Sequence, residues 1–152
     1  MQVVTVRVRG ETFGLPAHNV VEIMRAVAVS PLPGSPQAIT GVINVRGKPV
    51  VVIDPAVRFG KPDVAVTPNE NFVLVATTAR TIAVRVDIAE DLVDVDEASL
   101  TAAKSASSSL GMLHGIAAMP DGALVIYDVA AFLTQAEEEA IEEALARAAV
   151  AQ

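Results

Sequence analysis

The sequence of 152 residues predicts a mainly β fold, made of two similar small β units packed on each other and followed by a C-terminal α-helix. Three observations support this prediction. Valine is roughly one residue in six, and β-branched side chains pack well on a pleated sheet. Turns that contain glycine or proline divide most of the chain into short apolar segments. One pattern of strand, turn and strand also occurs twice.

The first part of the chain predicts short strands. Residues 3–9 alternate apolar and polar side chains, and a turn leads from them to a second strand at residues 13–15. Asn19 is expected to cap a one-turn helix with Glu22 at its third position. Residues 23–29 are apolar enough for a strand, and the prolines that follow them exclude regular structure.

The middle of the chain predicts three hairpins, each made of two apolar segments around a turn. They cover residues 41–54, 72–86 and 116–127. Residues 91–96 alternate again and indicate one more strand. Two loops are expected, one at residues 61–71 and one in the stretch rich in alanine and serine at residues 101–109.

Residues 135–152 predict a helix. Thr134 and Glu137 fit a capping box, and glutamates in the first turns suit the positive end of the helix dipole. Ile141 and Leu145 are four residues apart and share one face. Because they and a few alanines are the only apolar face of the helix, we expect it to be dispensable for the β units.

The repeated pattern is found in residues 41–54 and 115–128. The two segments have equal length, begin with glycine, end with aspartate and carry a glycine-bearing turn between apolar strands. A weaker match relates residues 13–22 to residues 82–90. The repeat predicts two similar β units, each too small for a deep pocket, whose apolar faces pack on each other.

Composition and charge exclude several classes of function. The net charge of −7 disfavours nucleic acid as a partner, because an acidic surface repels phosphate. No apolar run reaches the ~18 residues of a membrane span, and the N-terminus lacks the pattern of a signal peptide. The absence of cysteine excludes disulfides and thiolate metal sites and fits a cytoplasmic location. The two histidines, His18 and His114, cannot by themselves hold a transition metal.

The sequence offers little catalytic chemistry. It has no nucleophile elbow, no phosphate-binding glycine loop and no H-E-x-x-H motif. Asp54 and Asp128 are the candidates for a carboxylate pair, but each follows a strand, where aspartate commonly caps a turn or a helix. For both aspartates the capping role is therefore favoured over a catalytic one.

The first repeated hairpin and its flanks resemble the CheW-like domain family. The resemblance is carried by Ser30-Pro31-Leu32-Pro33, by Gly41-Val42-Ile43-Asn44-Val45-Arg46-Gly47 and by Arg58-Phe59-Gly60. Weaker matches follow the family order at residues 13–23, 82–87 and 115–129. Together they cover the chain from Val3 to Leu133.

The resemblance implies two five-stranded β-barrels with a hydrophobic core between them. It implies a CheW-like domain at residues 1–134, with one subdomain at residues 10–75 and the other at residues 76–134 plus the N-terminal strand. Residues 135–152 form the separate helix.

The function that the resemblance implies is that of a non-enzymatic signalling adaptor in the cytoplasm, without a cofactor. Such adaptors couple the cytoplasmic tips of chemoreceptors, the methyl-accepting chemotaxis proteins, to the regulatory domain of the histidine kinase CheA. The pathway is bacterial chemotaxis or a related motility system.

The resemblance also implies which residues contact the receptor and the kinase. They are Val20, Glu22, Met24, Asn44, Arg46 and Gly47. Glu22 and Arg46 matter for coupling in the family, and a bidentate contact between them would fix two loops relative to each other. The alternative is structural: a capping glutamate, and a solvated arginine at a hairpin tip. Val20 and Met24 are expected to be exposed for contact with the kinase, whereas Ile23 is expected to cover the core between the barrels.

Two other functions are kept as hypotheses. One is a small-molecule sensor that uses the cleft between the barrels, which needs convergent polar groups in an apolar pocket. The other is an enzyme that uses Asp54 and Asp128. Stimulation of the kinase in the presence of a receptor fragment separates the adaptor from both.

Overall fold

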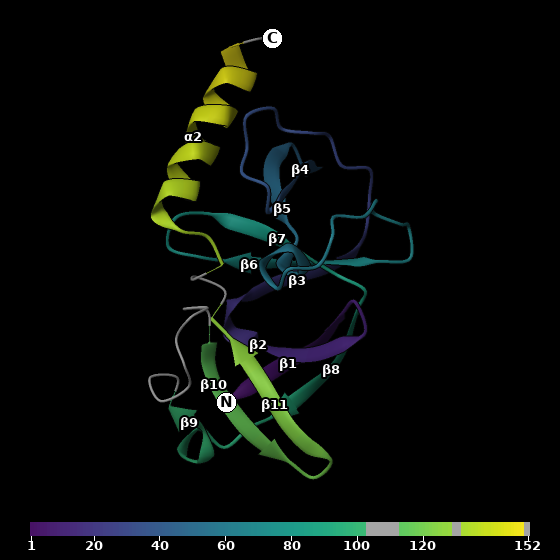
Figure 1. The fold of residues 1–152 in the computed structure, drawn as a ribbon, viewed down its shortest axis with the longest axis vertical. Helices are drawn as coiled ribbons and strands as arrows, with labels where there is room; N and C mark the ends of the chain where they lie inside the picture. The colour runs from purple at the N-terminus through teal and green to yellow at the C-terminus, as the bar shows by residue number, and fades with distance from the viewer. Residues whose placement is uncertain (103–112, 129–131, 151–152) are drawn as a thin grey trace.

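The computed structural model describes residues 1–102, 113–128 and 132–150, and Figure 1 shows its ribbon. The strands are β1 (Gln2–Val8), β2 (Glu11–Pro16), β3 (Val20–Arg25), β4 (Ile39–Val45), β5 (Lys48–Ile53), β6 (Asn71–Ala76), β7 (Thr81–Val86), β8 (Ile88–Asp94), β9 (Thr101–Ala102), β10 (Leu113–Met119) and β11 (Gly122–Tyr127). The helices are the 3₁₀ turns η1 (Ala17–Asn19) and η2 (Glu97–Ser99) and the α-helices α1 (Pro55–Arg58) and α2 (Gln135–Val150). None of the helices in these ranges has both the length and the apolar character needed to cross a membrane.

The strands form two sheets, which lie one above the other along the long axis of the molecule (Figure 1). The first sheet has the strand order β8-β1-β2-β11-β10-β9, and the second sheet has the order β3-β6-β7-β5-β4. The prediction of two small β units with a C-terminal helix is confirmed. The two-residue strand β9 lies beside the five longer strands of the first sheet.

The repeated hairpin occupies the same place in both sheets. β5 runs parallel to β7, with Val52 opposite Ala83, and β11 runs parallel to β2, with Ile126 opposite Gly14. The outer strands are exchanged between the halves of the chain, because β3 pairs with β6 and β8 pairs with β1. Each sheet therefore combines strands from both halves of the chain.

The strand pairing does not follow the subdomain division expected from the sequence. The expected boundary between residues 75 and 76 falls inside β6, which forms an antiparallel hairpin with β7 in the second sheet. β2, which that division assigns to residues 10–75, pairs with β1 in the first sheet. The physical reason is that a short turn joins antiparallel neighbours and so keeps both strands of a hairpin in one sheet.

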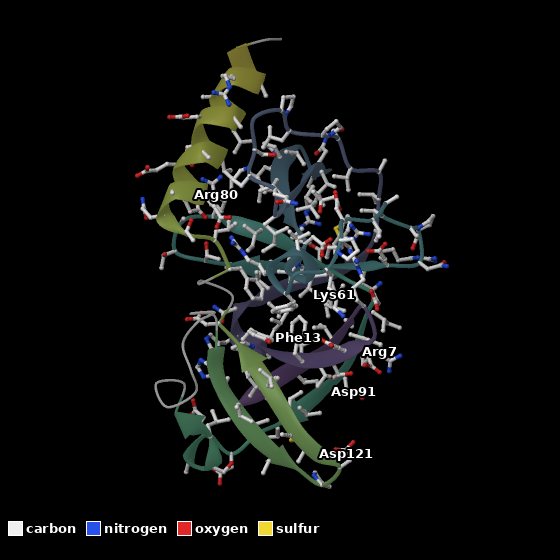
Figure 2. The ribbon with its side chains drawn as sticks, in the orientation of Figure 1. Arg7, Phe13, Lys61, Arg80, Asp91 and Asp121 are labelled. Atoms are coloured by element: carbon white, nitrogen blue, oxygen red, sulfur yellow. The ribbon has the colours of Figure 1, made fainter. Side chains whose placement is uncertain are left out.

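A hydrophobic cluster, here called the central core, fills the space between the two sheets. Its fully buried members include Val6 and Leu15 from the first sheet and Val73, Val75 and Val84 from the second. Phe13 lies between the sheets (Figure 2), and its ring meets the ring of Tyr127 edge-on with centroids 4.9 Å apart. The core between two β units that the resemblance implies is therefore present.

Each sheet also has a small core on its other face. In the second sheet this core contains Ile43, Val50, Val52, Phe72, Leu74 and Ala83, and it is called the second-sheet core below. Val51 and Ile53 point to the central core whereas Val50 and Val52 point to the second-sheet core, because successive side chains of a strand alternate between faces. β5 is therefore apolar along its length because both of its faces are buried.

Helix α2 contributes more to the core than the sequence suggested. Ile141 and Ala144 are 0% and 1% exposed, and Ile141 belongs to the central core together with Phe132. Arg80 lies beside the helix (Figure 2) and binds Glu138 at 2.9 Å, and a second ion pair joins Arg58 to Glu137. The expectation that the helix is dispensable for the β units therefore conflicts with its packing.

The capping box of α2 is confirmed. Glu137 N donates to Thr134 Oγ1 at 3.1 Å, and Thr134 N donates to Glu137 Oε1 at 2.8 Å. Each bond gives a side-chain acceptor to a backbone N–H group that has no partner within the helix.

Two local predictions are wrong. Asn19 ends the helical turn η1 and does not begin one, and Val20 already begins β3, which ends at Arg25 and does not reach residue 29. Tertiary pairing of β3 with β6 overrides the local capping pattern. Of the expected loop at residues 101–109, the first two residues form β9, and the rest lies outside the described residues.

Candidate functional site

The tip of the β4–β5 hairpin is a two-residue turn at Arg46 and Gly47. Both residues have positive φ, 50° for Arg46 and 86° for Gly47, which is typical of the tight turns that suit the twist of a hairpin. Gly47 N donates a 2.7 Å hydrogen bond to Asn44 Oδ1. Asn44 and Gly47 therefore fix the turn, and the turn determines where the Arg46 side chain begins.

Arg46 binds Glu22 in a bidentate contact. Arg46 Nη2 lies 2.7 Å from Glu22 Oε2, and Arg46 Nη1 lies 3.3 Å from Glu22 Oε1. These hydrogen bonds lower the pKa of Glu22 below its ordinary value and raise the pKa of Arg46. The Arg46 side chain is 71% exposed, so the pair lies at the surface, where a partner protein can reach it.

The pair joins the two edge strands of the second sheet. Glu22 is in β3 and Arg46 follows β4, and these strands stand at opposite ends of the strand order. A second link lies farther along, where Ser30 and Val42 exchange backbone hydrogen bonds of 2.9 and 2.8 Å. The two links close the second sheet on itself, and we call this line of closure the seam.

Gly41 is required at the seam. A Cβ atom on Gly41 would overlap Ser30 O and also meet the side chain of Val29. Because Ser30 O is a backbone atom held by its hydrogen bond to Val42, it cannot move aside. Close packing against Ser30 therefore explains why position 41 of the motif is a glycine.

The exposure of the side chains alternates along β3 and differs from the burial expected for Val20, Ile23 and Met24. Val20 and Met24 are half-buried, Val20 against the central core and Met24 against the second-sheet core. Ile23, which was expected to cover the core, is 46% exposed, and Val21 is 57% exposed. The reason is the period of two in a strand, which turns Val21 and Ile23 away from the cores, while a register shift between Val20 and Glu22 places Val20 and Met24 against different cores. Reading residues 20–25 as a strand would have found this exposed apolar pair.

Asp54 has a structural role. It is 2% exposed, its Oδ1 accepts a 3.0 Å hydrogen bond from Ala56 N at the start of α1, and its Oδ2 binds Arg9 at 2.9 Å. Burial raises the pKa of Asp54, against the opposing effects of the Ala56 hydrogen bond and of Arg85 and Arg9. The interpretation of Asp54 as a cap is confirmed.

The structure gives no support to a ligand site between the sheets, because the central core fills that space with side chains at most 8% exposed. A cavity of about 610 Å³ lies elsewhere, between residues 26–31 and residues 63–68. In the part of the chain that the structure describes, no group of three or more acidic or histidine side chains is placed to hold a metal ion.

Comparisons with known proteins agree with this architecture. The family model of the CheW-like domain matches residues 2–137. The chain is 24% identical to the probable chemotaxis protein CheW of Rhizobium etli, over 91% of each protein. It is 26% identical to the chemotaxis protein CheW of Klebsiella aerogenes, over 90% of this chain and 83% of that protein. The fold is similar to the crystal structure of the scaffolding protein TtCheW from Thermoanaerobacter tengcongensis, with a TM-score of 0.79, 24% identity and coverage of 90% and 89%.

Proposed function

This chain belongs to the CheW-like domain family, and from this premise we propose that it is a non-enzymatic adaptor that couples chemoreceptors to the histidine kinase CheA. The family consists of scaffold proteins and not of enzymes. The two relatives named chemotaxis protein CheW support a role in chemotaxis or a related motility pathway. Because receptor tips and kinase are cytoplasmic, the proposal also places the protein in the cytoplasm.

The observation that carries the proposal is the exposed pair of Glu22 and Arg46 at the seam. A bidentate contact holds both side chains in one geometry, and the turn at Asn44 and Gly47 holds the arginine end. Such a surface is suited to orienting a partner protein and not to chemistry on a small substrate. Glu22 and Arg46 are therefore the residues that we assign to coupling, with Asn44 and Gly47 in supporting roles.

Val20 and Met24 support the strand that carries Glu22. Both are half-buried, so they support β3 from the core side more than they contact a partner. The apolar contact itself falls to Val21 and Ile23, which stand exposed on either side of Glu22 in the sequence. β3 therefore presents exposed apolar side chains in addition to the carboxylate of the ion pair, and protein interfaces commonly combine the two.

Binding to both partners tests this function. We expect titration calorimetry to detect a complex with the CheA regulatory domain and another with a receptor cytoplasmic fragment. Transient signalling contacts bury about 1,200 Å² or somewhat more, and the dissociation constants should be about micromolar. Ile23→Asp places a charge within the proposed apolar contact and should weaken at least one of the two complexes, whereas Leu92→Asp, at an exposed position of β8 in the first sheet, is the matched control and should bind as the wild type does. Absence of heat and of any complex with either cognate partner rejects the proposal.

A further inference from the structure

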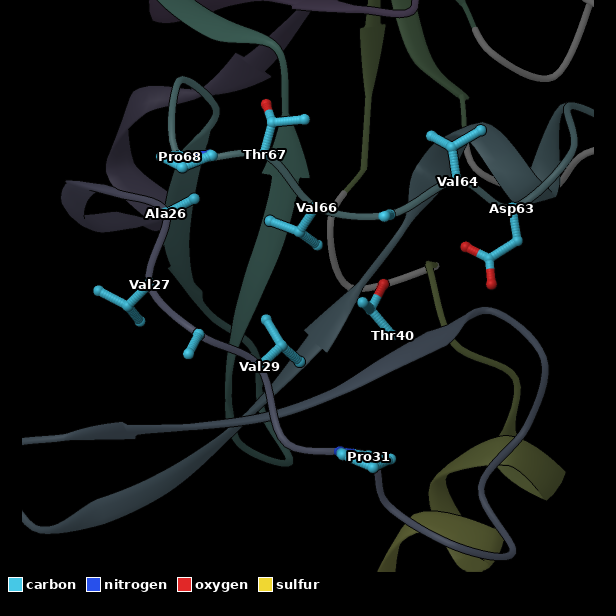
Figure 3. Close-up of a pocket in the computed structure, with 12 residues that line it drawn as sticks. Ala26, Val27, Val29, Pro31, Thr40, Asp63, Val64, Val66, Thr67 and Pro68 are labelled. Carbon is cyan, nitrogen blue, oxygen red and sulfur yellow. The ribbon is translucent and has the colours of Figure 1, made fainter.

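A groove opens where the ladder between β3 and β6 ends. The last link of this ladder is the 2.9 Å hydrogen bond from Ala26 N to Glu70 O. Beyond it the two chain segments separate and enclose the cavity of about 610 Å³ (Figure 3). Val27 and Val29 lie on one wall, and Val64 and Val66 lie on the other. This volume is within the range of about 300–1,000 Å³ that ligand sites occupy.

The floor of the groove is apolar and continuous with the interior of the sheet. Ala26, Val29 and Val66 pack against the second-sheet core. Val27 and Val64 remain 43% and 47% exposed at the rim. The groove therefore offers aliphatic surface that the described part of the chain leaves open to solvent.

Arg85 fixes the second wall. Its guanidinium donates to Val64 O at 2.7 Å and to Ala65 O at 2.9 Å, and it is held in turn by Glu70 at 2.6 Å. The arginine is only 3% exposed, so these contacts are shielded from water. The wall is preformed, and a ligand need not order it on binding.

The first wall carries unpaired backbone. Ala26 and Ser30 are both paired, but Val27, Ala28 and Val29 make no backbone hydrogen bond to the described residues. Three consecutive free peptide units form a short open edge, and such an edge accepts an added strand. A small apolar molecule would leave these donors and acceptors unused, whereas a peptide would pair with them.

Two polar side chains of the groove, Thr40 and Asp63, indicate which chemical groups a ligand needs. Thr40 Oγ1 is buried at the groove and has no hydrogen-bond partner among the described residues. Asp63 also lines the groove, and it forms no ion pair within the described ranges. A buried hydroxyl favours a ligand that hydrogen-bonds to it, and the Asp63 carboxylate, which acts on Arg85 electrostatically without forming an ion pair, favours a cation on a chain of net charge −7.

We propose that this groove binds a short extended peptide of a partner protein, in which one aliphatic side chain is flanked by lysine or arginine. The peptide backbone pairs with residues 27–29, the aliphatic side chain lies on Val29 and Val66, and the cation reaches Asp63. The site lies beyond the end of β3 and is separate from the pair of Glu22 and Arg46.

Amide chemical shifts of the isotope-labelled full chain test this proposal. The probe is the pentapeptide Lys-Thr-Ile-Thr-Lys, blocked at both ends, and it should give saturable shifts centred on residues 27–29 and 64–66. The matched peptide Glu-Thr-Ile-Thr-Glu should bind at least about tenfold more weakly, because it meets Asp63 with a like charge. The assay contains neither receptor nor kinase, so its result is independent of the proposed adaptor function.

Two variants locate the site. Ala28 is exposed, so Ala28→Trp fills the groove without entering the core and should abolish saturation, whereas Ala28→Ser should bind as the wild type does. Asp63→Asn should remove most of the difference between the two peptides. Unsaturable or scattered shifts, or unchanged binding by a folded Ala28→Trp protein, overturn the proposal. Equal binding of n-hexylamine and the lysine peptide would also overturn it, because the site would then take a small amphiphile.

Discussion

Arg46 Nη2 lies 2.7 Å from Glu22 Oε2, and through this contact the two edge strands of the second sheet are joined at the surface. In the strand order β3 and β4 are the two edge strands of the second sheet. Edge strands present unpaired backbone groups that can pair with another chain. The pair of Glu22 and Arg46, together with the bridge between Ser30 and Val42, protects both edges. One contact therefore serves the closure of the fold and the proposed interaction surface.

The titration of Glu22 should depend on Arg46. Hydrogen bonds from Arg46 lower the pKa of Glu22 in the folded state. The pair therefore contributes stability that is fully present above the unfolded pKa of glutamate and is lost as the pH falls through the lower folded value. In Arg46→Ala we expect the pKa of Glu22 to rise, as followed by the carboxyl carbon shift in NMR. Arg7→Ala is the control that leaves the Glu22 titration unchanged. Identical titration midpoints in wild type and Arg46→Ala would show that the pair does not persist in solution.

Gly41→Ala should destabilise the protein more than Gly60→Ala. Both glycines have positive φ, so both alanines cost about 1–2 kcal/mol of backbone strain. Only at Gly41 does the new Cβ meet the backbone of Ser30, which adds about 1–3 kcal/mol of overpacking. Nothing lies within 4 Å of a Cβ at Gly60. Urea unfolding midpoints measure the difference, and equal losses for the two variants would show that the seam is not tightly closed.

Arg85→Met should cost about 3–5 kcal/mol of unfolding free energy, because it leaves the buried Asp54 and Glu70 carboxylates without a shared partner. Hydrogen exchange should also become faster in residues 64–66, whose carbonyls Arg85 holds. The control is Arg7→Met, which breaks the exposed contact with Glu90 and should change stability by less than about 1 kcal/mol. If Arg85→Met and Arg7→Met lose the same small amount, the buried network does not stabilise the loop.

Ile141→Ala should lower the unfolding free energy by about 2–5 kcal/mol, because the side chain is fully buried in the central core. Leu92→Ala removes a side chain that is 59% exposed and should cost less than about 1 kcal/mol. Chemical denaturation of both variants checks this prediction. A cost for Ile141→Ala as small as that for Leu92→Ala would restore the expectation that α2 is dispensable.

The hairpins and the capping box could be predicted from the sequence because local signals determine them. Arg46-Gly47 and Pro120-Asp121 are turn pairs between apolar runs, and their strands lie where the pattern puts them. The repeat predicted that residues 41–54 and 115–128 form like units, and they take equivalent places in the two sheets. The pairing of Glu22 with Arg46 followed from the family resemblance and not from spacing.

Local signals could not predict which side chains of β3 are exposed or that α2 packs into the central core. Asn19 and Glu22 match a capping pattern, and only pairing with β6 makes residues 20–25 a strand with Ile23 outside. In the sequence Arg85 is one polar residue within an apolar strand. Its burial depends on its partners Asp54 and Glu70, which are distant in sequence. Such long-range contacts leave no periodic signal in a single sequence.

The role of Glu22 and Arg46 in coupling is tested most directly by the rate of CheA autophosphorylation with a receptor cytoplasmic fragment. The rate is measured with wild type, Arg46→Ala, Glu22→Ala and the double variant. We expect the wild type to stimulate the kinase and both single variants to lose most of this effect, with melting temperatures within about 2 °C of the wild type. Because the two residues form one contact, the double variant should lose less than the sum of the singles. Equal kinase rates with and without the wild-type chain would contradict the proposal that this protein couples receptors to CheA.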